Sequence, residues 1–389
     1  MSYKTIELFC GIGGFRTASD EAGCKTIWAN DISPNGCSVY RDNFGEYVLA
    51  EGDIKQEKYR IPDHDILTAG FPCQPFSSAG QKKGICDPRG TLFLEIIDII
   101  SSHTPKYFIL ENVRRMLSMQ NGTHFATILF ELSKLPYVIE WRVINAAHLG
   151  LAQNRERIFI IGTRIDSETV IPYVKLVNDK DLTHVLRTKY DGFKDYGRWK
   201  HISQYAKNFP LWGIAFQEKF FGYSPEDFSE KMPSRTLRNV LQENADNSFD
   251  YTEETLERIK QSRWVNKYVN GVQILYNQGG GARMGYTVFG TDGIASTLTA
   301  STSRHYERYR IGNCYRRLTN IEYARLQGFP DEHCKAVSVY DQYALYGNAV
   351  PPPMAKWVLK KLLSEGQTYF QEPNQRQLFQ LSLESLYDR

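Results

Sequence analysis

The chain has 389 residues, 42% of them hydrophobic and 13% aromatic, and its 47 basic and 44 acidic side chains leave a net charge of +3. This length and composition indicate a folded protein with a large core and two domains, and exclude a disordered, collagenous or fibrous chain. No apolar run approaches the ~20 residues that cross a bilayer, and the first ten residues lack a secretion signal, so we expect a cytoplasmic protein without a membrane partner.

The charged residues are unevenly distributed along the chain. Between Arg258 and Arg317, ten basic side chains stand against two acidic ones, so this segment carries +8 and the rest of the chain carries −5. A positive segment of this kind fits the neutralisation of nucleic-acid phosphates. The seven cysteines are odd in number and include no Cys-x-x-Cys pair, which predicts neither a disulfide framework nor a zinc site. We therefore expect no metal.

The first 165 residues alternate short apolar runs with amphipathic stretches, which is typical of a parallel sheet covered by helices. Apolar residues at three- and four-residue spacing predict helices over Thr91–Ser101 and Phe125–Leu135. This part of the chain is predicted to be an α/β fold with a doubly wound, mostly parallel sheet. The predicted strands are Thr5–Phe9, Lys25–Ala29, Ile66–Ala69, Tyr107–Leu110, Val138–Asn145 and Arg157–Gly162.

From about Ile171 to Arg310 this alternation gives way to aromatic-rich sequence with no clear period, which predicts a smaller second domain of irregular structure. Helical patterns return over Ile321–Gln327 and Met354–Leu363. We expect three segments, with the last one completing the first domain. Their predicted ranges are 1–170, 171–310 and 311–389.

A glycine-rich turn follows the first predicted strand. Gly11, Gly13 and Gly14 allow the backbone to turn tightly and approach a ligand at a helix N-terminus, although a purely structural turn explains the pattern about as well. Asp31 lies just past the second predicted strand, and Asp53 lies where a further short strand would end before Ile66–Ala69. They could accept hydrogen bonds from a ribose and an adenine, respectively. Each is equally well explained as a solvated carboxylate or a helix cap. Together they favour a cofactor that contains adenosine.

A cysteine and a carboxylate follow two further strands, at the edge where open α/β sheets bind ligands. Cys73 lies between two prolines, which favours a rigidly presented nucleophile over a buried structural thiol. Glu111 ends the next strand, where an enclosed carboxyl group can hold a proton near neutrality. Arg155 and Arg157 stand at alternate positions and could both point into the site, or could be surface arginines on a sheet edge.

These residues lie in segments that resemble, in order and spacing, the motifs of the cytosine-5 DNA methyltransferases, above all the bacterial restriction-modification enzymes. The resemblance covers about 1–165 and 311–360, and within 171–300 only the glycine-rich turn and Ile294–Ala300 match. It implies a Rossmann-like methyltransferase fold and S-adenosylmethionine as cofactor. The matching segments are ELFCGIGGF, GDI, GFPCQPFS, ENV, QNRER, RRLTNIEYARLQGFP and YGNAVPPPMA.

The resemblance also implies a mechanism. Cys73 would add to carbon 6 of a cytosine flipped out of the duplex, while Glu111 contacts ring nitrogen N3 and makes carbon 5 nucleophilic. Arg157 would hold the cytosine carbonyl oxygen and Arg155 would help to orient the site. The implied substrate-binding residues are Pro72, Gln74, Ser77 and Asn112. The implied cofactor-binding residues are Phe9, Gly11, Gly13, Asp31, Asp53, Ile54, Asn348 and Val350.

The same resemblance makes 1–170 the catalytic domain and 171–310 a target-recognition domain that reads a specific double-stranded DNA sequence. A cognate restriction endonuclease acting on that sequence would be a functional partner. Arg283, Arg304 and Arg308 are candidates for contacts to guanine, with phosphate contacts or solvated positions as the alternative.

Three other functions would account for part of this sequence pattern. A transfer-RNA cytosine-5 methyltransferase uses the same motifs, but Gly70–Gln74 and the long middle segment resemble the DNA enzymes. A catalytically silent DNA-binding regulator would lack Cys73 or Glu111, and both are present. A Rossmann oxidoreductase would need neither the Pro-Cys-Gln sequence nor the paired arginines.

Overall fold

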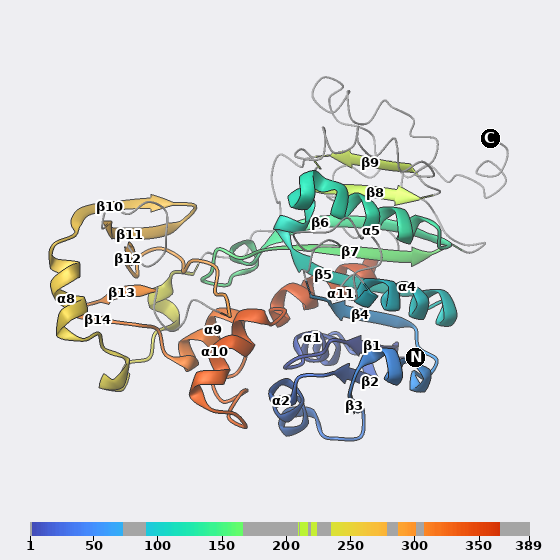
Figure 1. Cartoon of the computed structure of the whole chain (residues 1–389), viewed down its shortest axis with the longest axis horizontal. Helices are drawn as coiled ribbons and strands as arrows, with labels where there is room; N and C mark the ends of the chain where they lie inside the picture. Colours follow the sequence, from blue (N-terminus) through green and yellow to red (C-terminus); the bar gives the residue numbers. More distant parts are fainter. Residues whose placement is uncertain are drawn as a thin grey trace, which may run out of the picture.

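The computed structural model describes residues 2–72, 91–165, 209, 211–216, 219–223, 235–277, 287–300 and 307–365. Within these residues two β-sheets form two lobes, with helices α9 (Asn320–Gln327) and α10 (Val339–Asn348) near the junction (Figure 1). The described strands of the larger sheet have the order β3-β2-β1-β4-β5-β7-β6-β8-β9.

The first five strands of this order are mutually parallel, as the sequence predicts. They are β1 (Lys4–Leu8), β2 (Lys25–Asp31), β3 (Leu49–Glu51), β4 (Ile66–Gly70) and β5 (Tyr107–Val113). The other neighbours pair antiparallel, so the sheet as a whole is mixed. They are β6 (Tyr137–Asn145), β7 (Glu156–Arg164), β8 (Trp212–Phe216) and β9 (Lys219–Tyr223).

Helices cover both faces of the large sheet, which confirms the doubly wound prediction. Strand β5 shows why: Phe108 and Leu110 pack into one hydrophobic cluster while Tyr107 and Ile109 pack into another, because successive strand residues point to opposite faces. On the first face lie α3 (Ile54–Glu57), α4 (Thr91–His103) and α5 (Thr123–Ser133). On the second lie α1 (Gly14–Glu21) and α11 (Pro352–Glu365), while α2 (Pro34–Phe44) packs beside β2 and β3.

The C-terminal part of the described chain completes the large sheet domain. Helix α11 packs directly on α1, and a Cβ at Gly14 would overlap the carbonyl oxygen of Val350. The glycine at the start of α1 is therefore required by the close approach of a segment from the other end of the chain.

The smaller sheet is more regular than the sequence pattern indicates. Its strand order is β10-β11-β12-β13-β14 and helix α8 (Glu253–Lys260) precedes it. Register shifts in β10 and β11 break the two-residue alternation, which explains why no period is visible in the sequence. The strands are β10 (Arg263–Val269), β11 (Val272–Asn277), β12 (Thr287–Phe289), β13 (Arg308–Ile311) and β14 (Cys314–Arg316).

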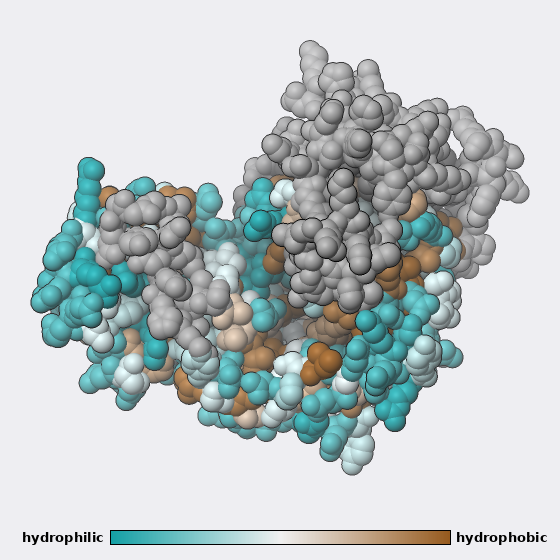
Figure 2. Space-filling model, in the orientation of Figure 1, coloured by the Kyte–Doolittle hydropathy of each residue, from teal (hydrophilic) through white to brown (hydrophobic). Residues whose placement is uncertain are grey.

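The two sheets divide the middle of the chain differently from the expected segments. Strand β8 extends the large sheet by pairing with β6, and β9 pairs with β8, whereas β14 belongs to the small sheet and ends at Arg316. Figure 2 shows a largely hydrophilic outer surface on the smaller lobe, and a hollow between the two lobes. Among the described helices none has the length and apolar character of a membrane span.

A packing prediction concerns the centre of the large sheet. Gly162 on β7 faces Phe108 on β5, and a Cβ at Gly162 would overlap the Phe108 ring. Gly162→Ala should therefore lower the free energy of unfolding by about 1–3 kcal/mol, measured by urea denaturation. In a Phe108→Leu background the same change should cost at least 0.5 kcal/mol less, because neighbouring sites couple by about that amount or more. If the free-energy costs of the two substitutions add, the contact between Gly162 and Phe108 is contradicted.

Candidate active site

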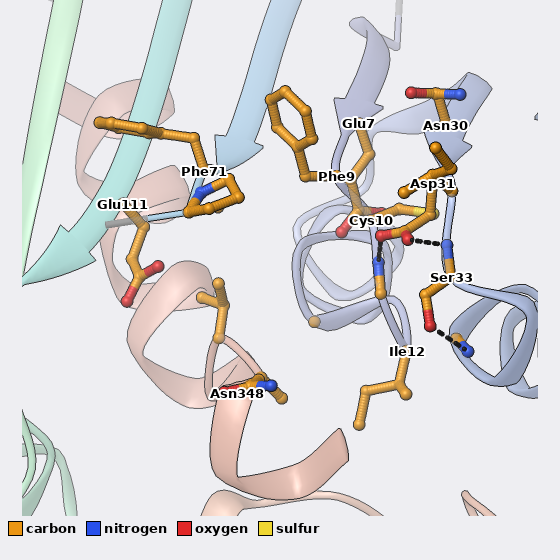
Figure 3. A pocket seen from close by; sticks show the side chains of 18 of the residues that line it. Glu7, Phe9, Cys10, Ile12, Asn30, Asp31, Ser33, Phe71, Glu111 and Asn348 are labelled. Carbon is orange, nitrogen blue, oxygen red and sulfur yellow. Dashed lines mark hydrogen bonds between the residues drawn. The ribbon is translucent and has the colours of Figure 1, made fainter. Parts of the chain in front are cut away.

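A cavity of about 870 Å³ lies at the carboxyl ends of β1, β2, β4 and β5. Its walls come from both ends of the chain, as Figure 3 shows for Asp31 and Glu111 on facing sides and Asn348 below them. Of the residues expected to bind cofactor or substrate, the cavity is lined by Phe9, Gly11, Asp31, Asp53, Ile54, Pro72, Glu111, Asn112, Arg157, Asn348 and Val350.

The glycine-rich turn forms one wall of this cavity. Phe9 and Gly11 have left-handed φ values of 54° and 51°, a conformation that costs a residue with a side chain about 1–3 kcal/mol. A Cβ at Gly11 would meet no atom within 4 Å, so the backbone there borders open space. Gly13, by contrast, does not line the cavity. Its φ of 80° and the Phe44 ring packed against it make it a close-packing position at the start of α1.

The side chains of both expected aspartates accept hydrogen bonds from backbone N–H groups. Asp31 accepts hydrogen bonds at 2.7 Å from the Gly11 and Ser33 N–H groups, and Figure 3 shows its bond to Ser33. Burial raises the pKa of Asp31, so those two donors offset part of the cost of enclosing a charge. Asp53 caps α3 by accepting from the Lys55 N–H at 3.0 Å. The helix-cap explanation therefore holds for Asp53, which also lines the cavity.

Glu111 and Arg157 form a buried ion pair at the other side of the cavity. The Arg157 Nε lies 2.9 Å from Glu111 Oε1, and the two residues reach each other because Val113 on β5 pairs with Arg157 on β7. Burial raises the pKa of Glu111 although Arg157 and Arg155 favour its charged form. Burial thus favours the protonated carboxyl group, and the two arginines limit that preference.

Arg155 does not line the cavity, contrary to the expectation that both arginines could point into it. Its guanidinium donates to the carbonyl oxygens of Leu298, Gly347 and Ala349 at 2.8–3.0 Å. The reason is local: Arg155 precedes β7, which begins at Glu156, so the alternation of a strand does not govern its direction. Arg155 instead fixes the backbone on both sides of Asn348.

Asn112 connects the carboxylate side of the cavity to the segment that leads into the expected nucleophile loop. Its side-chain N–H donates to the Phe71 carbonyl at 2.9 Å, and Pro72 follows in the cavity wall. The expected residues Cys73, Gln74 and Ser77 lie outside the described residues. The structure thus places Phe71, Pro72 and Glu111 in the wall of one cavity.

Glu7 lines the cavity but was not predicted from the sequence as a site residue. It points from the middle of β1 toward the start of α1, where Oε1 accepts from the Phe15 N–H at 3.2 Å. Its Oε2 is buried and has no hydrogen-bond partner within the described part of the chain. Burial raises the pKa of Glu7 to about 8. A carboxylate inside the otherwise apolar run Ile6–Leu8 was the available signal.

Comparison with known proteins identifies the family. The profile of the family described as C-5 cytosine-specific DNA methylase matches residues 3–364. The chain belongs to this family. It is 32% identical to the type II methyltransferase M.HpaII of Haemophilus parainfluenzae over 373 residues, which cover 93% of this chain and 90% of that protein.

Other similarities are more local or more distant. The type II methyltransferase M.HaeII of Haemophilus aegyptius is 42% identical over 214 residues, 54% of this chain and 66% of that protein. A crystal structure of Spodoptera frugiperda DNMT2 superposes with a TM-score of 0.61 at 18% identity, covering 93% of this chain and 100% of that one. At that identity the likeness shows the fold alone. The family match and the similarity to M.HpaII identify the enzyme as a DNA cytosine-5 methyltransferase by family.

The buried ion pair predicts a pH-dependent stability change. The pKa of Glu111 is raised in the folded methyltransferase, so its contribution to stability is present at low pH and is lost as pH rises through that pKa. Arg157→Ala removes the positive charge that limits this loss of stability. Its destabilisation should therefore grow as the pH is raised above 4.5, the ordinary pKa of a glutamate, toward about 3–5 kcal/mol, in urea unfolding experiments.

The matched background for this measurement is Glu111→Gln, which cannot ionise. There Arg157→Ala should have the same effect at every pH. A pH-independent effect in the wild-type background would show that the ion pair does not set the protonation of Glu111.

Proposed function

We propose that the chain transfers the methyl group of S-adenosylmethionine to carbon 5 of a cytosine in a specific double-stranded DNA sequence. The observation that carries the proposal is a single cavity that joins the glycine-rich turn with Asp31 to the buried Glu111–Arg157 pair. Cofactor groups and a target base can therefore meet in one cavity.

The residues around the turn fit S-adenosylmethionine. Gly11 borders open space that a side chain would fill. Asp31 ends β2 and Asp53 follows the neighbouring strand β3. The unpartnered oxygen of Glu7 suits the ammonium group of an amino acid. Phe9 would pack against the cofactor, Asp31 would bind the ribose, and Asp53 with Ile54 would bind the adenine. When bound, the sulfonium supplies an electrophilic methyl group.

The residues on the opposite side fit a cytosine ring. Glu111 would donate a proton or hydrogen bond to N3 while the Cys73 thiolate adds to carbon 6, which makes carbon 5 nucleophilic enough to take the methyl group. Loss of the carbon-5 proton and expulsion of Cys73 then restore the ring. Arg157 would hold the carbonyl oxygen, with Pro72 and Asn112 beside the base. Arg155 would act through the backbone around Asn348 rather than by touching the base.

The base must leave the duplex to reach such a cavity. We assign sequence recognition to the smaller lobe, where Arg258, Arg263 and Lys267 are exposed on α8 and β10 and could neutralise phosphates. Arg308 is buried, so we no longer expect it to contact guanine. Arg283 and Arg304 lie outside the described residues. Segment 171–310 thus remains the proposed recognition region, apart from strands β8 and β9.

The biological role would be protection of DNA from a cognate restriction endonuclease in the cytoplasm. The support is that the similar proteins M.HpaII and M.HaeII are named type II methyltransferases. The enzyme would need no metal, since methyl transfer from a sulfonium to a nucleophilic carbon requires none.

The proposal is tested by expression in cells whose DNA carries no cytosine methylation, followed by bisulfite sequencing. Protected cytosines in one short recurring sequence are expected, and Cys73→Ala should abolish them. Cys24→Ala is the matched control, because Cys24 is a buried thiol at the amino end of β2, away from the cavity. Methylated transfer RNA with unmodified DNA would overturn the assignment.

Glu7 predicts a pH dependence of cofactor binding. With a pKa of about 8, Glu7 is mostly neutral at pH 6 and must lose its proton to pair with an ammonium group. The ratio of the Kd for S-adenosylhomocysteine in Glu7→Gln to that in the wild type should therefore rise with pH from 6 to 8, by up to about tenfold per unit. Isothermal titration calorimetry measures it. A constant ratio would remove Glu7 from the ammonium site.

A further inference from the structure

His333 lies behind the glycine-rich turn, on the side away from the cavity. Its ring Nε2 is 2.7 Å from the carbonyl oxygen of Ile12, across 321 residues of sequence. A carbonyl can only accept, so Nε2 carries the hydrogen and donates it. His333 is buried and does not line the cavity, whereas Ile12 does.

The loop that carries His333 is held against α2. The Asn43 side chain donates to the His333 carbonyl at 2.8 Å, and the Lys335 ammonium lies 3.8 Å from an Asp42 carboxylate oxygen. The His333 ring packs against Phe44 and Phe329, with centroid distances of 6.0 and 4.6 Å. The ring therefore has little freedom to turn away from Ile12.

The turn itself is closely confined by the same helix. Phe44 covers Gly13, and a Cβ at Gly36, near the start of α2, would lie 3.3 Å from the Gly11 carbonyl oxygen. Packing thus limits where Gly11 and Gly13 can move. It does not define how the peptide between Ile12 and Gly13 is rotated, because both glycines tolerate many backbone conformations. Two directional hydrogen bonds define that rotation: within the turn the Gly13 N–H donates to the Cys10 carbonyl at 2.8 Å, and from outside it His333 donates to the Ile12 carbonyl.

We propose that His333 is a positioning residue for the cofactor: by donating to the Ile12 carbonyl it fixes the turn that receives the methionine part of S-adenosylmethionine. The assignment rests on the proposed function of the cavity. It links cofactor affinity to the segment between α9 and α10, because that segment holds the donor. His333 touches neither cofactor nor base, so the methyl-transfer step itself is unaffected.

The test compares two variants of nearly equal length and volume. His333→Gln keeps an amide N–H that can reach the Ile12 carbonyl, and His333→Met has no donor. Calorimetry with S-adenosylhomocysteine should give a Kd for the Met variant about 2- to 12-fold above that of the Gln variant, as expected for one buried hydrogen bond. The KM for S-adenosylmethionine should rise in parallel, while kcat and the Kd for duplex DNA stay within twofold of the wild type.

Tyr137→Phe is the control for a purely structural effect. It also deletes one buried side-chain hydrogen bond to a carbonyl, that of Pro105 at 2.6 Å, but at the amino end of β5, opposite the cavity. It should lower the thermal unfolding temperature about as much as His333→Met without changing the Kd for S-adenosylhomocysteine. A changed Kd in this control would show that lost stability alone weakens binding, and would overturn the inference.

Two further results would count against it. Equal Kd values for the Met and Gln variants, in a wild type that binds S-adenosylhomocysteine, would overturn the role of His333 and leave the proposed function standing. A wild type that does not bind S-adenosylhomocysteine would overturn both. Should His333→Met unfold below the assay temperature, His333→Phe replaces it, because a phenyl ring keeps the packing with Phe44 and Phe329 without a donor.

Discussion

The site depends above all on keeping the Glu111 carboxylate buried beside Arg157. A carboxyl group enclosed among strands is costly to ionise unless a cation is held against it. The cation is supplied by β7, which runs antiparallel to β5 and brings Arg157 opposite the end of that strand. Through this 2.9 Å contact, the antiparallel direction of β7 places a positive charge beside Glu111. The topology of the sheet therefore affects the protonation of that carboxyl group.

The second constraint is that the cavity is closed by the far end of the chain. Asn348 and Val350 line it, Arg155 holds the carbonyl groups on both sides of Asn348, and the Val350 backbone packs against Gly14. The first 165 residues alone would leave that side of the cavity open. A molecule bound there would contact segments from both ends of the sequence, and the smaller lobe lies between those segments along the chain.

Much of this could be predicted from the sequence because the information is local. Buried parallel strands are continuous apolar runs, and Asp31 and Glu111 stand where those runs end. What could not be predicted depends on partners distant in sequence. The five residues of β8 show no sign that they pair with β6, and Arg155 turns to carbonyl groups more than 140 residues away. Glu7 was missed because its one local signal, a carboxylate inside an apolar strand, does not show which partner the carboxylate faces.

The central claim is that a cytosine enters the cavity beside Glu111 and is attacked there by Cys73. The most direct measurement uses a duplex with 5-fluorocytosine at the methylated position, since fluorine on carbon 5 cannot leave as a proton and Cys73 is then not expelled. After incubation with S-adenosylmethionine, mass spectrometry should find the peptide containing Cys73 joined to a base that carries one added methyl group. A methylated base without a protein adduct, or an adduct on another residue, would contradict the account.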